Sequence, residues 1–236
     1  MRRTLTEAVV ATAAAATVYH RWLQPRAERW GATDAEVREV LPGDDLVAPP
    51  ATQTTRAVTI AAPREQVWPW LVQLGADRGG FYRYDWLEDV FRLGIHNADR
   101  VVPAWQHRAV GDLVHADAAG TGGWYVARFE PPELMVLQMA DVPAGRPARR
   151  DEGMRWEFLW TFVVRDRGDG TTRLIVRERV GCASRRTALL LAPAGLVSFV
   201  MSRSMLLGIK RRAESRVAVP APSPTAQRTT TTLPRT

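Results

Sequence analysis

Apolar and polar residues alternate most regularly between residues 154 and 165. Every second position there is apolar: Met154, Trp156, Phe158, Trp160, Phe162 and Val164. Successive side chains on a β-strand point to opposite faces, so this pattern predicts a strand that is buried along one whole face. The large rings on that face are suited either to filling a core or to lining a wide pocket.

Shorter stretches of similar character predict further strands over 54–62, 109–116, 123–130, 133–140 and 171–181. Asp169-Gly170 is a favoured turn between the strand at 154–165 and the next one. Gly120-Thr121-Gly122-Gly123 lies between two predicted strands and precedes no helix, which favours a hairpin turn over a dinucleotide-binding loop. The second half of the chain is therefore expected to be an antiparallel meander.

Apolar residues recur at helical intervals after the first predicted strand, at Val67, Trp70, Leu71 and Leu74. Pro63 is suited to the first turn of this helix, and Gly75 to its end. Pro69 should bend the helix or delay its regular part, because proline has no N–H to donate.

Three more helices are predicted, one short helix from Asp34 to Val40, one from about Tyr84 to Leu93, and a long one from Thr187 to about Ser215. The long segment begins with fourteen uncharged residues at 187–200. That length fits a buried core helix better than a membrane span, which needs roughly 20 apolar residues. Pro193 predicts an irregular start to it.

The two ends of the chain differ from its middle. Residues 1–30 begin with arginines and an Ala-rich run, which fits a signal-like segment, an interfacial anchor or a helix packed on the domain. Residues 31–53 are expected to be a linker that wraps onto the domain at 54–215. Residues 216–236 are rich in Pro and Thr and should be disordered, since they cannot bury enough apolar surface.

Charge follows the same division. The net charge is +7, but the middle of the chain, 31–182, is mildly acidic and the excess of arginine lies in both ends. A nucleic-acid-binding domain would carry its positive charge on the folded body, so we expect no nucleic acid partner. Basic ends fit an anionic membrane surface, or equally well solvated tails. With Cys182 as the single cysteine, we expect a cytoplasmic protein, membrane-associated if at all through its N-terminal segment.

Two stretches carry a resemblance to a known superfamily. Residues 60–68 (IAAPREQVW) continue as 69–75 (PWLVQLG), in which a strand ends in small residues and a Pro precedes Val-Trp in a helix. Residues 80–88 (GFYRYDWLE) and 96–100 (HNADR) are similar to a bacterial branch of the same group. The chain thus resembles the START-related SRPBCC superfamily, which includes lipid-transfer START domains and polyketide cyclase/dehydratases.

The resemblance implies an α+β helix-grip fold. In that fold a curved antiparallel sheet of six or seven strands wraps around a long C-terminal helix, with two short helices after the first strand. It also implies a ligand cavity between the sheet and the long helix, bounded by 154–165, 171–181 and 187–215. One fold hosts many activities, so the resemblance says little about function.

Glu178 is the polar residue with the most chemical interest. It shares a strand face with Leu174, Val176 and Val180, so we expect its carboxylate to point into an apolar interior. There it must be paired, protonated or hydrated, and it becomes a candidate ligand anchor or general acid/base. The alternative is that the strand has already reached solvent at residue 178.

His96 and Asp99 in the irregular loop are the other candidate catalytic residues. The candidate ligand-binding residues are the aromatic and apolar side chains Tyr82, Tyr84, Trp86, Trp105, Trp124, Trp156, Phe158, Trp160, Phe162, Val176 and Phe199. For each single ring, ordinary core packing is the competing interpretation. The four histidines show no zinc-ligand spacing, and no P-loop or nucleophile elbow is present, so neither metal nor cofactor is expected.

Three function classes remain. The first is binding or transfer of a hydrophobic small molecule, such as a lipid, an isoprenoid or a polyketide-like compound. The second is a cyclase or dehydratase that uses Glu178 or His96 as acid/base, and the third is a membrane-peripheral accessory protein. We rank binding first, because no acid/base pair is evident. Nothing in the sequence predicts the oligomeric state.

Overall fold

The computed structural model describes residues 17, 19–82 and 95–215. Its strands are β1 (Thr52–Ile60), β2 (Leu113–His115), β3 (Gly123–Glu130), β4 (Leu134–Asp141), β5 (Arg146–Pro147), β6 (Trp156–Asp166) and β7 (Thr172–Cys182). Its helices are η1 (Tyr19–Leu23), α2 (Gln24–Glu28), α3 (Asp34–Arg38), η2 (Asp44–Leu46), α4 (Arg64–Val72), η3 (Pro103–Trp105), η4 (Arg150–Glu152), α6 (Arg185–Leu191) and α7 (Ala194–Glu214). The helix predicted at 84–93 and the tail at 216–236 lie outside the described residues.

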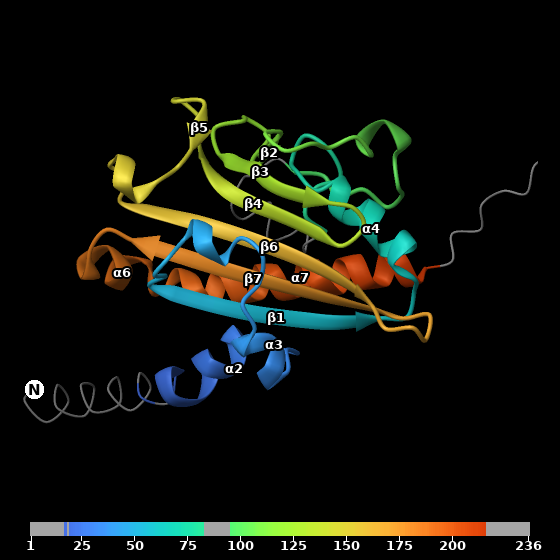
Figure 1. Cartoon of the computed structure of the whole chain (residues 1–236), viewed down its shortest axis with the longest axis horizontal. Coiled ribbons are helices and arrows are strands. Elements are labelled where there is room, and N and C mark those ends of the chain that lie inside the picture. The colour runs from blue at the N-terminus through green and yellow to red at the C-terminus, as the bar shows by residue number, and fades with distance from the viewer. Residues whose placement is uncertain (1–16, 18, 83–94, 216–236) are drawn as a thin grey trace, which may run out of the picture.

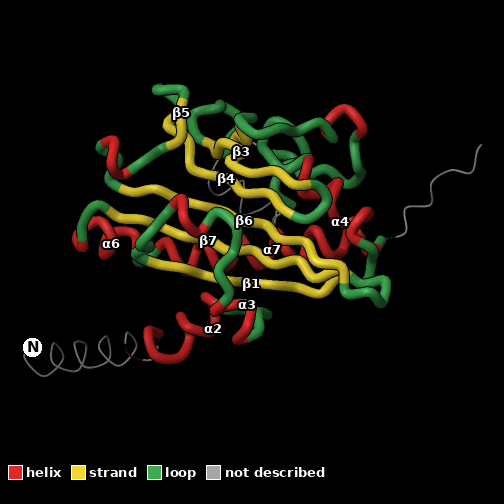
Figure 2. The backbone as a smooth tube through the Cα atoms, in the orientation of Figure 1, coloured by secondary structure: helices red, strands yellow, loops and turns green. Residues whose placement is uncertain are grey.

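The strands form one antiparallel sheet of seven in the order β1-β7-β6-β4-β3-β2, with β5 added beside β4. The long helix α7 lies behind this sheet in Figure 1, and the N-terminal segment crosses the front. Figure 2 shows the same division, with α7 behind the strands and α2 and α3 below them. A seven-stranded antiparallel sheet with a long C-terminal helix on one face is an α+β helix-grip fold, as predicted from the sequence.

The inner face of the sheet builds the main core against α4 and α7. Period-two residues of β6 and β7, including Phe162 and Val176, are almost fully buried there. From α7 they meet Met205, Leu206 and Ile209, which are spaced to share one side of the helix. The alternation at 154–165 therefore does mark a strand with one apolar face inward, as expected.

The outer face of the sheet is covered by α3, by η2 and by the residues between them. Arg177 of β7 is completely buried on this face and donates hydrogen bonds to Asp44 Oδ2 at 2.7 Å and to the carbonyl of Glu36 at 2.7 Å. Arg173 pairs with Glu36 at 2.8 Å, and hydrogen bonds from Arg173 hold the pKa of Glu36 at about 2, well below its usual range. Thr33 begins α3 with a capping box that also uses Glu36.

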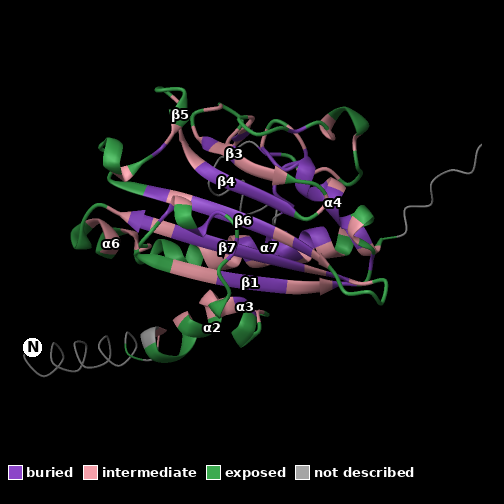
Figure 3. Ribbon diagram, viewed as in Figure 1, coloured by how far each residue is buried: buried purple, intermediate pink, exposed green. Residues whose placement is uncertain are grey.

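The prediction of one buried helix from Thr187 to Ser215 is wrong. The segment forms two helices, α6 and α7, with a bend of 52° between them, because Pro193 cannot continue the hydrogen-bond ladder. No residue of α6 is buried, and the side chains of Leu189 and Leu190 are 74% and 82% exposed. Within this pair of helices, Figure 3 shows buried residues in the later part of α7. An apolar run alone does not reveal whether another element covers it.

No single helix among the described residues has the length and composition to cross a membrane. The bent pair α6 and α7 together meets that test by length and composition.

One predicted strand is shorter than expected. Residues 109–116 contribute only β2, because the preceding residues form a turn. Asp112 accepts a hydrogen bond from the N–H of Ala109 at 2.9 Å, and Gly111 has φ +93°, a conformation that glycine adopts without strain. The other predicted strands agree with β1, β3, β4, β6 and β7 within two residues at each end.

Candidate functional site

A cavity of about 520 Å³ lies between the inner face of the sheet and the start of α7. Its lining comes from both ends of the chain and from several strands. The residues are Tyr19, Gln24, Ala27, Glu28, Ala51, Thr52, Thr54, Ala116, Gly122, Gly123, Trp124, Met139, Ala140, Trp156, Phe158, Glu178, Val180, Cys182, Ala188, Leu191, Ala192, Ala194, Gly195 and Ser198. Most of this surface is apolar, as a site for a hydrophobic molecule requires.

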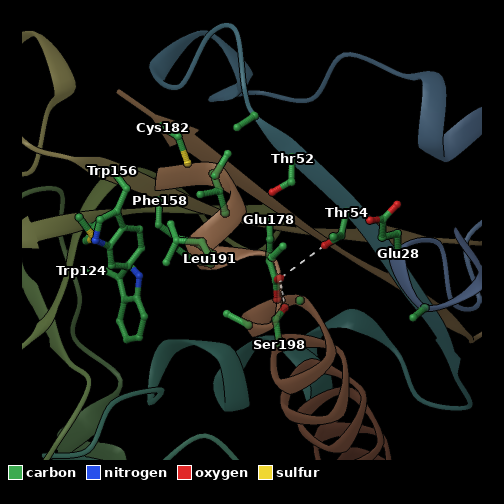
Figure 4. A pocket seen from close by; sticks show the side chains of 18 of the residues that line it. Glu28, Thr52, Thr54, Trp124, Trp156, Phe158, Glu178, Cys182, Leu191 and Ser198 are labelled. Atoms are coloured by element: carbon green, nitrogen blue, oxygen red, sulfur yellow. Dashed lines mark hydrogen bonds between the residues drawn. The ribbon is translucent and has the colours of Figure 1, made fainter. Parts of the chain in front are cut away.

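One side of the cavity is aromatic. Trp156 and Phe158 from β6 and Trp124 from β3 line it, together with Leu191 from α6 (Figure 4). The ring centroids of Trp124 and Phe158 are 6.3 Å apart, and Trp124 also packs on Trp160, which belongs to the core behind. The period-two pattern of β6 thus places its first rings at the cavity and its later rings in the core.

The other side of the cavity is polar and is organised by Glu178. In β7 this residue stands opposite Thr54 of β1 and Trp160 of β6, so its side chain points to the inner face. It is 6% exposed, and its carboxylate accepts hydrogen bonds from the hydroxyls of Ser198 and Ser202 of α7. Thr54 donates a longer hydrogen bond of 3.4 Å to Oε2 (Figure 4).

The cation that compensates Glu178 is Arg56, which the sequence analysis missed. Its Nη1 lies 3.0 Å from Glu178 Oε2, and the side chain is 1% exposed. Arg56 also donates to the carbonyl of Ala27 at 2.9 Å and to Ser198 at 3.3 Å, while its guanidinium lies 5.7 Å from the ring of Phe199. The strand alternation that places Val58 and Ile60 on one face also places residue 56 there, so the signal existed.

A second carboxylate, Glu28, lines the cavity from α2 and was also missed. Its Oε1 accepts a hydrogen bond of 2.7 Å from Gln24, one turn earlier in the chain. Figure 4 shows Glu28 on the same side of the cavity as Thr54 and Glu178, away from the tryptophans. No local sequence pattern connects this N-terminal helix with a cavity whose other lining residues reach as far along the chain as Ser198.

Several predicted ligand-binding residues lie in the core and are absent from the cavity lining. Phe162 and Val176 are buried to within 1%. Trp160 is 7% exposed and packs between Phe81, Trp124 and Phe162, with no hydrogen-bond partner for its indole N–H. Phe199 also lies outside the lining, and its ring packs against the guanidinium of Arg56.

The aromatic residues of the loop region lie elsewhere. Tyr82 is completely buried, and its hydroxyl donates to the carbonyl of Trp70 at 2.9 Å; burial raises the pKa of this phenol. Trp105 ends η3, half-buried and outside the cavity lining. Tyr84 and Trp86 lie outside the described residues.

The remaining candidates for chemistry do not join Glu178. His96 and Asp99 are both exposed, and neither lines the cavity. Cys182 does line it, and burial raises the pKa of its thiol, which favours the neutral and less reactive form. Within the described ranges no group of three or more His, Cys, Asp or Glu residues is arranged to hold a metal ion.

Comparison with known proteins gives distant structural likeness only. No protein-family model matches the chain, and no curated protein is significantly similar in sequence. Similar solved structures include a hypothetical protein from Helicobacter pylori (12% identity, TM-score 0.46, covering 74% of this chain and 95% of that one). A protein from Arthrobacter aurescens is 16% identical, with a TM-score of 0.41 and coverage of 77% and 94%.

A norcoclaurine synthase point mutant from Thalictrum flavum, solved with a transition-state analogue, is 12% identical to this chain. Its TM-score is 0.38, and the match covers 68% of this chain and 96% of that one. Likeness at this distance carries no argument about ligand, reaction or site residues.

Proposed function

We propose that this protein binds or transfers a hydrophobic small molecule, and that it is a member of the SRPBCC superfamily. The observation that supports the proposal is the cavity of about 520 Å³, which is mostly apolar and has one polar side organised by Glu178. A pocket of this size and composition buries most of a small ligand, while a few convergent polar groups orient it. Native mass spectrometry of the purified full-length chain tests the proposal by weighing any molecule that copurifies.

Replacing Glu178 by Gln should weaken the binding of an apolar alcohol such as naphthylethanol by about tenfold. The amide keeps the shape of the side chain but loses its charge, and hydrogen bonds to charged acceptors are the stronger ones. Isothermal titration calorimetry on both proteins gives the ratio.

The matched control is Glu157→Gln. Glu157 is also a buried carboxylate paired with an arginine, Arg150 at 2.5 Å, but it lies outside the cavity lining. Equal losses of affinity in the two variants would assign the effect to general destabilisation and would remove Glu178 from the site.

For the cyclase or dehydratase alternative, Glu178 is the one acid/base predicted from the sequence that lines the cavity among the described residues, and Glu28 is a second carboxylate there. His96 and Asp99 are exposed and outside the lining, so they offer no partner for proton transfer there. Binding therefore remains our first choice, because general acid–base catalysis requires groups within hydrogen-bond reach of the reacting atoms.

A second candidate function is docking on an anionic membrane, and the exposed leucines of α6 favour it. Leu189 and Leu190 lie between the cavity-lining Ala188 and Leu191, so the apolar surface adjoins the ligand site. Arg185 and Arg186 at the start of the same helix are exposed and could meet anionic headgroups. The basic turn at the other end of α7 is less available, because Lys210 is paired with Glu214.

The variant Leu189→Ser/Leu190→Ser should weaken binding to vesicles of phosphatidylcholine and phosphatidylglycerol, measured by sedimentation, by about a hundredfold or more. Each leucine that leaves water contributes about 1.5–3 kcal/mol. The control is Val40→Ser. The Val40 side chain is also exposed, at 83%, and it lies far from α6 in the sequence. Equal sedimentation of the double variant and the parent, or binding independent of phosphatidylglycerol and salt, would exclude docking through this helix.

A further inference from the structure

The charged side chains that line the cavity are acidic in the described part of the chain. Among the described residues that line it, Glu28 and Glu178 are the charged side chains, and no Lys, Arg or His is present. The remaining polar lining consists of uncharged groups such as Thr52 and Thr54. A ligand that enters the cavity therefore meets carboxylates and no lining cation.

Arg56 lies behind this surface, and its charge is already matched. It is 1% exposed, pairs with Glu178 at 3.0 Å, and donates its other hydrogen bonds to Ala27 and Ser198. Glu28, in contrast, accepts a hydrogen bond from the neutral Gln24 and has no cation partner within the described part of the chain. The polar side of the cavity consequently keeps an excess negative charge.

The hydrogen-bonding capacity that remains there is mainly that of an acceptor. The hydroxyls of Ser198, Ser202 and Thr54 already direct their hydrogens to the Glu178 carboxylate. A carboxylate offers about four lone-pair positions. Glu178 already has these three hydroxyls and Arg56 as donors, whereas Glu28 accepts from Gln24, so the capacity to accept from a ligand lies mainly at Glu28. A ligand that brought only acceptors would add no hydrogen bond to the Glu28 carboxylate.

The aromatic side of the cavity has compatible electrostatics. Trp124, Trp156 and Phe158 present π systems, whose faces attract cations and suit flat apolar groups. An aromatic amine could thus place its ring against these side chains and direct its ammonium group to Glu28 and Glu178 (Figure 4). An anion such as a fatty acid would face two carboxylates, and the described lining residues include no cation to receive it.

We infer that the cavity selects apolar ligands that carry a hydrogen-bond donor, above all a cationic amine, and discriminates against carboxylic acids. This inference rests on the proposed function, since it names the class of ligand for the same cavity.

Three ligands of nearly equal size test the inference: naphthylethylamine, naphthylethanol and naphthylacetic acid. At neutral pH they are a cation, a neutral donor and an anion. Calorimetric titration of the full chain should give the amine about tenfold tighter binding than the alcohol, and the acid about tenfold weaker binding than the alcohol. Binding of the acid as tight as that of the amine would overturn the inference and leave the proposed function standing. If none of the three binds, the proposed function fails as well.

The variant Glu28→Gln tests whether the selectivity for the amine arises in the cavity. It should lower the ratio of amine to alcohol affinity by about threefold or more, because the excess charge has gone. The control Glu130→Gln removes an exposed carboxylate that does not line the cavity, and it should leave that ratio unchanged. An equal fall of the ratio in both variants would mean that the overall charge of the protein, and not the cavity, attracts the amine.

Discussion

The variant Arg56→Met should lose about 3–5 kcal/mol of unfolding free energy, the cost of leaving a buried carboxylate without its cation. Arg56 and Glu178 are 1% and 7% exposed at their side chains and lie 3.0 Å apart. Methionine keeps much of the volume and removes the charge, so packing changes little. For a domain of this size we expect the melting temperature to fall by about 10 °C.

Two further variants separate the charge effect from other causes. Adding Glu178→Met to Arg56→Met removes both charges, and most of the lost stability should return. Arg128→Met breaks an exposed pair with Asp45 and should cost less than about 1 kcal/mol. Denaturant unfolding measures all of these variants. A single Arg56→Met variant within about 1 kcal/mol of the parent would contradict the burial of this pair.

The second large effect is expected for Gly208→Ala in the middle of α7. Alanine normally favours a helix over glycine by about 1 kcal/mol. Here an added Cβ would lie 2.1 Å from the carbonyl oxygen of Tyr82 and 2.8 Å from its Cβ. Tyr82 has φ +55° and its ring is buried, so that backbone cannot easily retreat. We expect a loss of about 3 kcal/mol, measured by urea unfolding.

Gly195→Ala is the matched control on the same helix. Nothing lies within 4 Å of an added Cβ at this position. The variant should therefore be neutral or stabilising by up to about 1 kcal/mol. If both alanine variants gain stability, the close approach of Tyr82 to α7 does not exist in solution.

The sheet and the orientation of Glu178 were predictable because both depend on local periodicity. Apolar residues at every second position of 154–165 identify β6 and its inner face, and the same alternation places Glu178 beside Val176 and Val180. The same alternation places Arg56 on the inner face of β1, but the strand was predicted from Val58 and Ile60 alone.

Other parts of the site depend on contacts that no local pattern records. Glu28 reaches the cavity because α2 packs beside β1 and α7, and this packing is decided by tertiary contacts. The exposure of Leu189 and Leu190 was not predictable either, because apolar composition does not show whether a covering element exists. Tyr82 was expected near a ligand, whereas its positive φ and its bond to the Trp70 carbonyl keep it in the core.

The order of charges along β7 has a consequence for folding. Arg177 and Arg179 point to the outer layer, where Asp44 lies 2.7 Å and 3.5 Å from them, and Glu178 between them points to Arg56 on the inner side. If β7 paired with its neighbours one residue out of register, both arginines would turn inward and the carboxylate outward. Three charges would then be desolvated without partners. A sheet mispaired in this way is therefore strongly destabilised. The charges of β7 favour the native register whether or not a ligand is bound.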